Sequence, residues 1–207
     1  MKTTGVTNVE CARFNNLVYA RTLKAGSEFF YRNFTETAGW EPCVYQDINW
    51  SNDIVFSYIM DPIQRRHKGV SEFIIAADLV DLLLSDQRNI GKLMKVIPFL
   101  DGHSASLHHI YGDCVDKMHW ILMTNDHQVA IRETEAFLAK HSAPPINWNV
   151  EFTHATGAYM SEIYTRIKSQ WEWTADPCID DTVRSYFQRD IDLYNRVQRD
   201  YARNHSS

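Results

Sequence analysis

The stretch Leu17–Phe34, which reads LVYARTLKAGSEFFYRNF, decides the fold. Its first part, Leu17–Leu23, predicts a buried strand, and an amphipathic segment with helical spacing begins at Ser27. The short loop between them contains Lys24 and Gly26. The first main-chain N–H groups of a helix point outward and the helix dipole favours negative charge, so a strand, a tight loop and a helix start together predict an anion site.

The rest of the chain predicts an α/β fold. Polar residues 1–16 are expected to form a leader, Ser27 to cap a helix over 27–38, and Gly39 to end it. Residues 71–97 carry two or three helical patterns. Further strands are expected at Cys43–Tyr45, Ile54–Met60 and His119–Thr124, and further helices after Asp61-Pro62, over Gln128–Lys140 and over Thr182–Arg203. Strands that alternate with helices predict a mostly parallel, P-loop-like sheet flanked by helices, in a single domain over residues 1–207 with the C-terminal helix at 182–203.

Composition excludes some classes of function. The net charge of −5 argues against a general nucleic-acid-binding surface. The N-terminus has no apolar signal core and no run approaches ~18 apolar residues, so we expect a soluble protein without a membrane partner, in the cytoplasm. The four cysteines are widely spaced without a CxxC motif, which favours reduced thiols over two disulfides.

Three further motifs follow the Lys24 loop in order. The strand Ile54–Met60 leads into Asp61-Pro62-Ile63-Gln64-Arg65, and Lys68 stands one turn later. Asp101-Gly102-His103 lies between the two halves of the chain, and Tyr186–Tyr194 reads YFQRDIDLY. This ordered set resembles the sulfotransferase family, and in particular its small, carbohydrate-type, bacterial or phage-like members. In that family a K-x-G-[ST]-like loop, a strand ending in R-[DN]-P-x-x-R and a C-terminal Y-x-x-D-x-x-L-Y helix occur in this order.

The resemblance implies a donor, 3′-phosphoadenosine 5′-phosphosulfate, whose sulfuryl group passes to a hydroxyl or amine of a small-molecule or carbohydrate acceptor. It implies that the donor is bound by the loop and by the basic helix, through Lys24, Ala25, Gly26, Ser27, Arg65 and Lys68. Lys24 would stabilise charge on the leaving phosphate. His103 is the first candidate for the general base, since histidine titrates near neutrality, and no metal is required. Asp101 would orient His103 or act as the base itself, with Asp47 and Glu28 in reserve.

Three residues depart from the family pattern. Met60 replaces the arginine that binds the 3′-phosphate, Lys68 replaces a serine, and Glu28 places a carboxylate beside the expected anion. These departures favour an alternative, a catalytically inactive sulfotransferase-fold protein with a binding or structural role. A phage or host-interaction component, associated with a virion or another protein, would fit this alternative. The oligomeric state is left open.

The sequence disfavours two other classes of site. His103, His108, His109 and Cys114 are residue types that bind zinc, but their spacing fits no common zinc motif. A P-loop kinase is disfavoured because GxxxxGK[ST] is absent. His119 stands on an apolar strand and is interpreted as a core residue.

Overall fold

The structure is a computed structural model that describes residues 9–76, 78–85, 102–124, 126–150, 165 and 177–205. The chain divides into two compact units. The sheet unit comprises Met1–Met60, Leu107–Thr153 and Leu193–Ser207, and the helix unit comprises Asp61–Ser106 and His154–Asp192. The single domain expected over residues 1–207 stays a prediction.

The sheet unit contains a five-stranded sheet in the order β3-β1-β2-β4-β5. The strands are β1 (Glu10–Phe14), β2 (Leu17–Ala20), β3 (Glu41–Val44), β4 (Ile54–Ile59) and β5 (His119–Leu122). β2, β4 and β5 are parallel, whereas β1 is antiparallel to both β2 and β3. The α/β class is confirmed, but the sheet is mixed, so the prediction of a mostly parallel sheet is correct only for β2, β4 and β5.

The antiparallel part arises from a hairpin in the expected leader. β1 and β2 are joined by Asn15-Asn16, and Asn15 has a φ of 53°, as tight hairpin turns require. Cys11 and Ala12 of β1 are fully buried. The leader prediction over 1–16 is therefore wrong for this hairpin, because β1 (ECARF) has no apolar alternation that would mark it as a strand among its polar neighbours.

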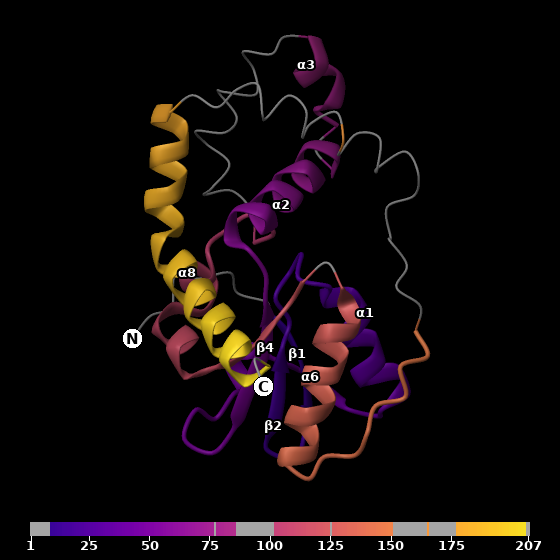
Figure 1. Cartoon of the computed structure of the whole chain (residues 1–207). Helices are drawn as coiled ribbons and strands as arrows, with labels where there is room; N and C mark the ends of the chain where they lie inside the picture. Colours follow the sequence, from indigo (N-terminus) through magenta and orange to yellow (C-terminus); the bar gives the residue numbers. More distant parts are fainter. Residues whose placement is uncertain are drawn as a thin grey trace. The chain divides into compact units, whose positions relative to one another are not determined.

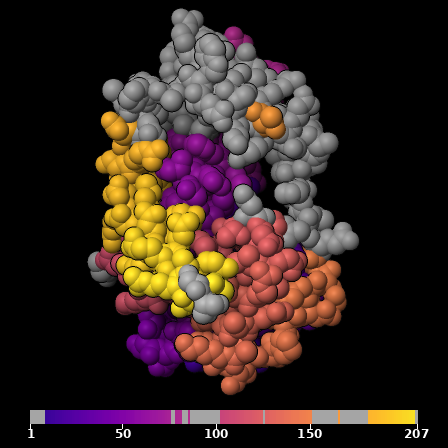
Figure 2. All heavy atoms as spheres, viewed as in Figure 1, coloured from indigo at the N-terminus to yellow at the C-terminus, as the bar shows by residue number. Residues whose placement is uncertain are grey.

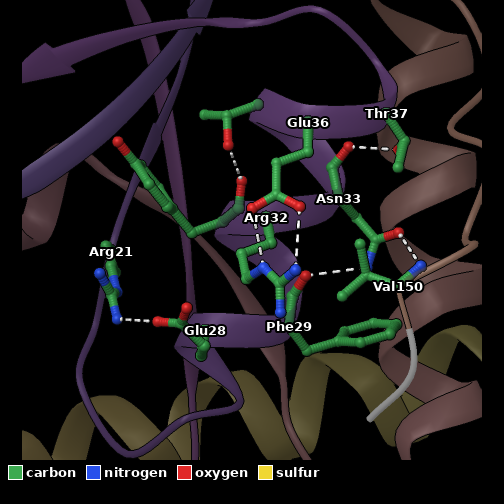
Figure 3. Close-up of polar contacts among 10 residues, drawn as sticks. Arg21, Glu28, Phe29, Arg32, Asn33, Glu36, Thr37 and Val150 are labelled. Atoms are coloured by element: carbon green, nitrogen blue, oxygen red, sulfur yellow. Dashed lines mark hydrogen bonds and ion pairs between the residues drawn. The ribbon is translucent and has the colours of Figure 1, made fainter. Parts of the chain in front are cut away.

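The segment after β2 forms the expected helix. α1 (Ser27–Arg32) continues without a break into a π-helical turn, η1 (Asn33–Thr37), and Gly39 ends the run with a φ of 68°. Asn33, the first residue of η1, is fully buried. Its side chain donates to the carbonyl of Phe29 and accepts from the N–H of Val150, as Figure 3 shows. α1 is thereby fixed to the loop over residues 142–150.

An aromatic core covers one face of the sheet. α1 and α6 (His127–Lys140) lie together beside the strands in Figure 1, and their apolar side chains pack on β2 and β4. The Phe30 ring stacks on Tyr58 with centroids 3.8 Å apart, and the buried Tyr58 hydroxyl bonds Thr134 at 2.7 Å. In Figure 2, α6 and residues 141–150 form a continuous surface over this face. Each large aromatic side chain contributes about 2–3 kcal/mol when it is buried in this way.

The opposite face of the sheet is covered by shorter elements, α5 (Leu107–Tyr111) and the 3-10 helix η4 (Gly112–Lys117). Trp120 of β5 donates its indole N–H to the carbonyl of Val115 at 2.9 Å. A second 3-10 turn, η2 (Tyr45–Asp47), follows β3. His119 is exposed and its ring stacks on Phe137, so its interpretation as a core residue is wrong. It is the first residue of β5, where the strand enters the sheet from solvent.

The helix unit begins directly after β4 and Met60. Asp61 ends the strand and caps α2 (Pro62–Ala76), since its carboxylate accepts from the N–H of Gln64 at 2.9 Å. Pro62 occupies the first helical position, where a missing N–H costs nothing. The predicted break and basic helix are confirmed.

Two more helices follow in the helix unit. α3 spans Val80–Ser85, and α8 spans Pro177–Asn204, beginning in the helix unit and ending in the sheet unit. The expected C-terminal helix at 182–203 lies within α8. The later part of the helical patterns at 71–97 lies outside the described residues. Within the described ranges, no helix combines the length and apolar composition needed to cross a bilayer.

Gly69 allows α2 to approach the main chain at His103 very closely. A Cβ atom at position 69 would lie 2.2 Å from the carbonyl oxygen of His103 and 2.9 Å from the N of Ser104. Only glycine fits there, because both neighbours are main-chain atoms that cannot rotate away. This contact positions His103, a candidate site residue, against α2.

We expect Gly69→Ala to lower the free energy of unfolding by about 2–3 kcal/mol, the scale of overpacking, even though alanine favours helix. Gly39→Ala is the matched control: its Cβ would meet nothing within 4 Å, so it adds only left-handed strain of about 1–2 kcal/mol. Urea unfolding of both variants measures the difference. A smaller loss for Gly69→Ala than for Gly39→Ala would contradict the close approach.

Candidate functional site

The loop from β2 to α1 has an unusual main-chain conformation. Lys24 has a φ of 68° and Gly26 a φ of 69°, both in the left-handed region. Glycine adopts this conformation freely, whereas a lysine there costs about 1–2 kcal/mol. Left-handed residues in a tight turn direct successive N–H groups to one side, which makes a concave site for an anion. Strain at a non-glycine residue is typical of functional loops.

The start of α1 lies at the end of this loop. The N-cap is Gly26 and not the expected Ser27, and no side chain caps the helix. The N–H of Phe30 makes the first helical bond, to the carbonyl of Gly26 at 3.2 Å. The continuous run through Thr37 aligns peptide dipoles toward the loop, so the helix start carries partial positive charge.

Arg21 offsets the negative charge of Glu28. Its guanidinium forms ion pairs with Glu28 of α1 and Glu10 of β1, and it lies 5.3 Å from the centre of the Tyr31 ring. Figure 3 shows Glu28 turned toward Arg21. The repulsion expected between Glu28 and a bound anion is therefore reduced. Glu28 was also a reserve candidate for the general base, and its carboxylate is already paired with Arg21.

A chain of buried hydroxyl groups supports the loop from below. The Ser57 hydroxyl of β4 donates to the carbonyl of Ala20 at 2.5 Å, so the Thr22 hydroxyl, 2.7 Å away, must donate to Ser57. The Tyr111 hydroxyl lies 2.9 Å from Thr22 and donates to it in turn. Each bond polarises the next, which strengthens the chain. The carboxyl ends of β2 and β4 are thereby fixed where the loop begins.

Three other predicted site residues, Arg65, Lys68 and His103, lie in the helix unit. Arg65 of α2 is only 1% exposed and donates to the carbonyl of Ala105, so it holds the segment after His103. Lys68 is exposed on the same helix. His103 and Glu72 are each about one-third exposed, and His103 Nε2 lies 3.9 Å from Glu72 Oε2.

The structure thus divides the predicted site residues between the two units. Lys24, Ala25, Gly26 and Ser27 lie together in the sheet unit, whereas Arg65, Lys68 and His103 lie in the helix unit. Asp101 lies outside the described residues. The reserve base Asp47 is in η2, where its carboxylate accepts from the N–H of Val44 at 3.3 Å. Met60 is buried in the core of the sheet unit, where its apolar side chain binds no phosphate.

Sequence reasoning missed several residues that shape the site: Arg21, Thr22, Ser57, Glu72 and Tyr111. Arg21 lies just before the loop in the sequence, so its positive charge could have been assigned to the site from the sequence alone. The hydroxyl partners are far apart in the sequence, so no local pattern connects them. In the part of the chain that the structure describes, no three histidine, cysteine or acidic side chains gather as metal ligands.

Comparisons of the chain with protein families, with characterised proteins and with solved structures find no match. Support for a function therefore comes from the residues and from the geometry of the site.

The direction of the hydroxyl chain makes a testable prediction. Tyr111→Phe removes the hydroxyl that donates to Thr22. It should lower the free energy of unfolding by about 1 kcal/mol, because Thr22 still donates to Ser57. Thr22→Val removes the middle hydroxyl, which accepts from Tyr111 and donates to Ser57. Because valine has nearly the same volume as threonine, the loss of about 2–3 kcal/mol in the free energy of unfolding reports the two hydrogen bonds. Denaturant unfolding measures both. Equal losses, or a larger loss for Tyr111→Phe, would contradict the assigned direction.

Proposed function

We propose that the protein is a sulfotransferase-like enzyme that transfers a sulfuryl group from 3′-phosphoadenosine 5′-phosphosulfate to a hydroxyl or amine acceptor, a carbohydrate or another small molecule. The observation that carries the proposal is the left-handed Lys24 between β2 and α1. It combines a strained main chain, a cationic side chain and an uncapped helix start at the carboxyl end of a parallel strand, where α/β folds bind phosphate.

The loop would act on the charge of the donor. The main-chain N–H groups near Gly26 and Ser27, together with the Lys24 ammonium group, would hold the 5′-phosphosulfate. The acceptor oxygen attacks sulfur in line with the bond to the phosphate, that sulfur–oxygen bond breaks, and negative charge grows on the leaving phosphate. Fixed donors that face this charge lower the barrier without any covalent help from the protein.

His103 remains the proposed general base. Its imidazole would take the proton of the acceptor hydroxyl or amine as the new bond to sulfur forms. The structure adds a carboxylate to this proposal: Glu72 Oε2, at 3.9 Å, would attract the imidazolium once it forms. In this proposal Glu72 has the orienting role that the sequence analysis assigned to Asp101.

Binding of adenosine 3′,5′-bisphosphate, the product left by the donor, tests the loop. We expect calorimetry to show binding to the wild type, and Lys24→Ala to weaken it by about 1.5–3 kcal/mol, the scale of a charged hydrogen bond. Lys24→Gly should weaken nucleotide binding by the same amount. Its free energy of unfolding should stay near that of the wild type, because the relief of left-handed strain offsets the larger conformational entropy that glycine gives the unfolded chain. Lys140→Ala, an exposed lysine of α6, is the control and should bind normally.

The outcomes separate the alternatives. If the folded wild type shows neither binding heat nor a thermal shift with millimolar nucleotide, the proposed enzymatic function is wrong. That result would favour the inactive binding or structural protein, which the burial of Met60 also supports. Binding that survives both Lys24 variants would place the nucleotide elsewhere.

A second experiment tests recognition of the 3′-phosphate by Lys68. Because Lys68 is exposed, it acts as a screened point charge. Adenosine 3′,5′-bisphosphate should therefore bind more tightly than adenosine 5′-phosphate at low salt, with a preference that shrinks as salt rises and is reduced in Lys68→Ala. Equal affinities for the two nucleotides at low salt would show that Lys68 does not replace the family's 3′-phosphate ligands.

A further inference from the structure

Two cysteines face each other at the antiparallel edge of the sheet. Cys11 of β1 and Cys43 of β3 are direct partners in the strand register. Direct partners in antiparallel strands project their side chains to the same face of the sheet. Both cysteines are free thiols in the structure. The pair lies wholly within the sheet unit and takes no part in the proposed sulfuryl transfer.

The hydrogen-bond pattern defines the spacing of this pair. The N–H of Tyr45 donates to the carbonyl of Val9 at 3.0 Å, which marks positions 9 and 45 as a hydrogen-bonded pair. Such pairs recur at every second residue, so Cys11 and Cys43 form the next one. Their Cα atoms are then expected about 5.5 Å apart, within the usual span of a disulfide.

The sheet also permits the small movement that a bond requires. Opposed Cβ atoms in a sheet lie about 4.5–5.5 Å apart, with the larger separation in hydrogen-bonded pairs such as this one, whereas a disulfide needs about 3.5–4.5 Å, so the strands must approach by about 1 Å. β3 is an edge strand, so it can shift toward β1 without breaking a ladder on its other side.

The surroundings give the two thiols different reactivities. Cys11 is fully buried, whereas Cys43 is partly exposed. A hydrogen bond with the Cys11 thiol and the positive charge of Arg13 lower the pKa of Cys43 to about 7, against the opposing effect of partial burial. The same contact, together with burial, raises the pKa of Cys11. The exposed thiol is thus the nucleophile, and the buried one is protected from solvent.

We propose that Cys11 and Cys43 are a redox-responsive dithiol that hydrogen peroxide converts to a disulfide between β1 and β3. The Cys43 thiolate attacks the peroxide and becomes a sulfenic acid, with release of hydroxide. The Cys11 thiol passes its proton to that hydroxide, which gives the first water, and its sulfur displaces the second oxygen as hydroxide. That hydroxide takes up the proton that Cys43 released on ionising and becomes the second water. Two thiols and one hydrogen peroxide give one disulfide and two waters. A thiol reductant restores the pair.

The disulfide would stabilise the half of the sheet that carries the Lys24 loop. β1 is hydrogen-bonded to β2, and the N–H of Arg21 donates to the carbonyl of Glu10 at 3.0 Å. A bond from position 11 to position 43 closes a long chain segment that includes the loop and α1. The entropy lost by the unfolded chain should raise Tm by on the order of 5–10 °C.

The test treats the full chain with one equivalent of hydrogen peroxide. Peptide mapping without reductant should recover Cys11 linked to Cys43, with two fewer titratable thiols, a higher Tm, and reversal by dithiothreitol. Cys43→Ser should abolish the shift in Tm and the linked peptide. Cys114→Ser, which changes a partly buried thiol of η4, is the matched control and should keep both.

Three results would overturn the proposal. The first is retention of all the thiols after treatment. The second is a linked peptide that joins other cysteines or two chains. The third is direct oxidation of Cys43 to the sulfinic acid in a folded protein, since a neighbouring thiol would resolve the sulfenic acid first. Each of these can be read even if nucleotide binding is absent, so failure here is distinct from failure of the proposed function.

Discussion

The left-handed main chain at Lys24 is the constraint on which the candidate site depends. A lysine adopts this conformation only where its surroundings compensate for the strain. Here β2 is bonded on both sides, by β1 and β4, and the hydroxyl chain through Thr22 holds the strand end at the start of the loop. α1 is fixed at its far end by Asn33. The loop is therefore held between two anchored elements.

Electrostatics at this loop follow from the same arrangement. Arg21 pairs with both Glu10 and Glu28, so the charge of Glu28 is partly balanced beside the positive ends of the peptide dipoles at the helix start. The chain as a whole carries a charge of −5, and a local cationic site is still consistent with that total. The redox pair joins β1 to β3, across the edge of β1 that faces away from β2. Oxidation there would stabilise the strands that support the loop without modifying any residue of the loop.

The sequence predicted the elements whose signals are local. β4 and β5 are apolar runs, α2 begins at Asp61-Pro62, and α6 is amphipathic, so all four were located to within a few residues. β1 was missed because a five-residue strand among polar residues resembles a leader. The loop Lys24–Ser27 was predicted as an anion site, but its left-handed backbone and its hydroxyl support depend on Ser57 and Tyr111, which only the fold brings near. The pairing of Cys11 with Cys43 was hidden for the same reason, since it follows from strand register.

The most direct test of the central claim is an NMR titration of the ¹⁵N-labelled protein with adenosine 3′,5′-bisphosphate. If the loop binds the 5′-phosphate, the amide signals of Gly26 and Ser27 should shift downfield and saturate, because an N–H that donates to phosphate is deshielded. The amides of β3, two strands away from β2 in the sheet, should stay unchanged. Saturating shifts confined to other residues, with Gly26 and Ser27 unaffected, would contradict the account.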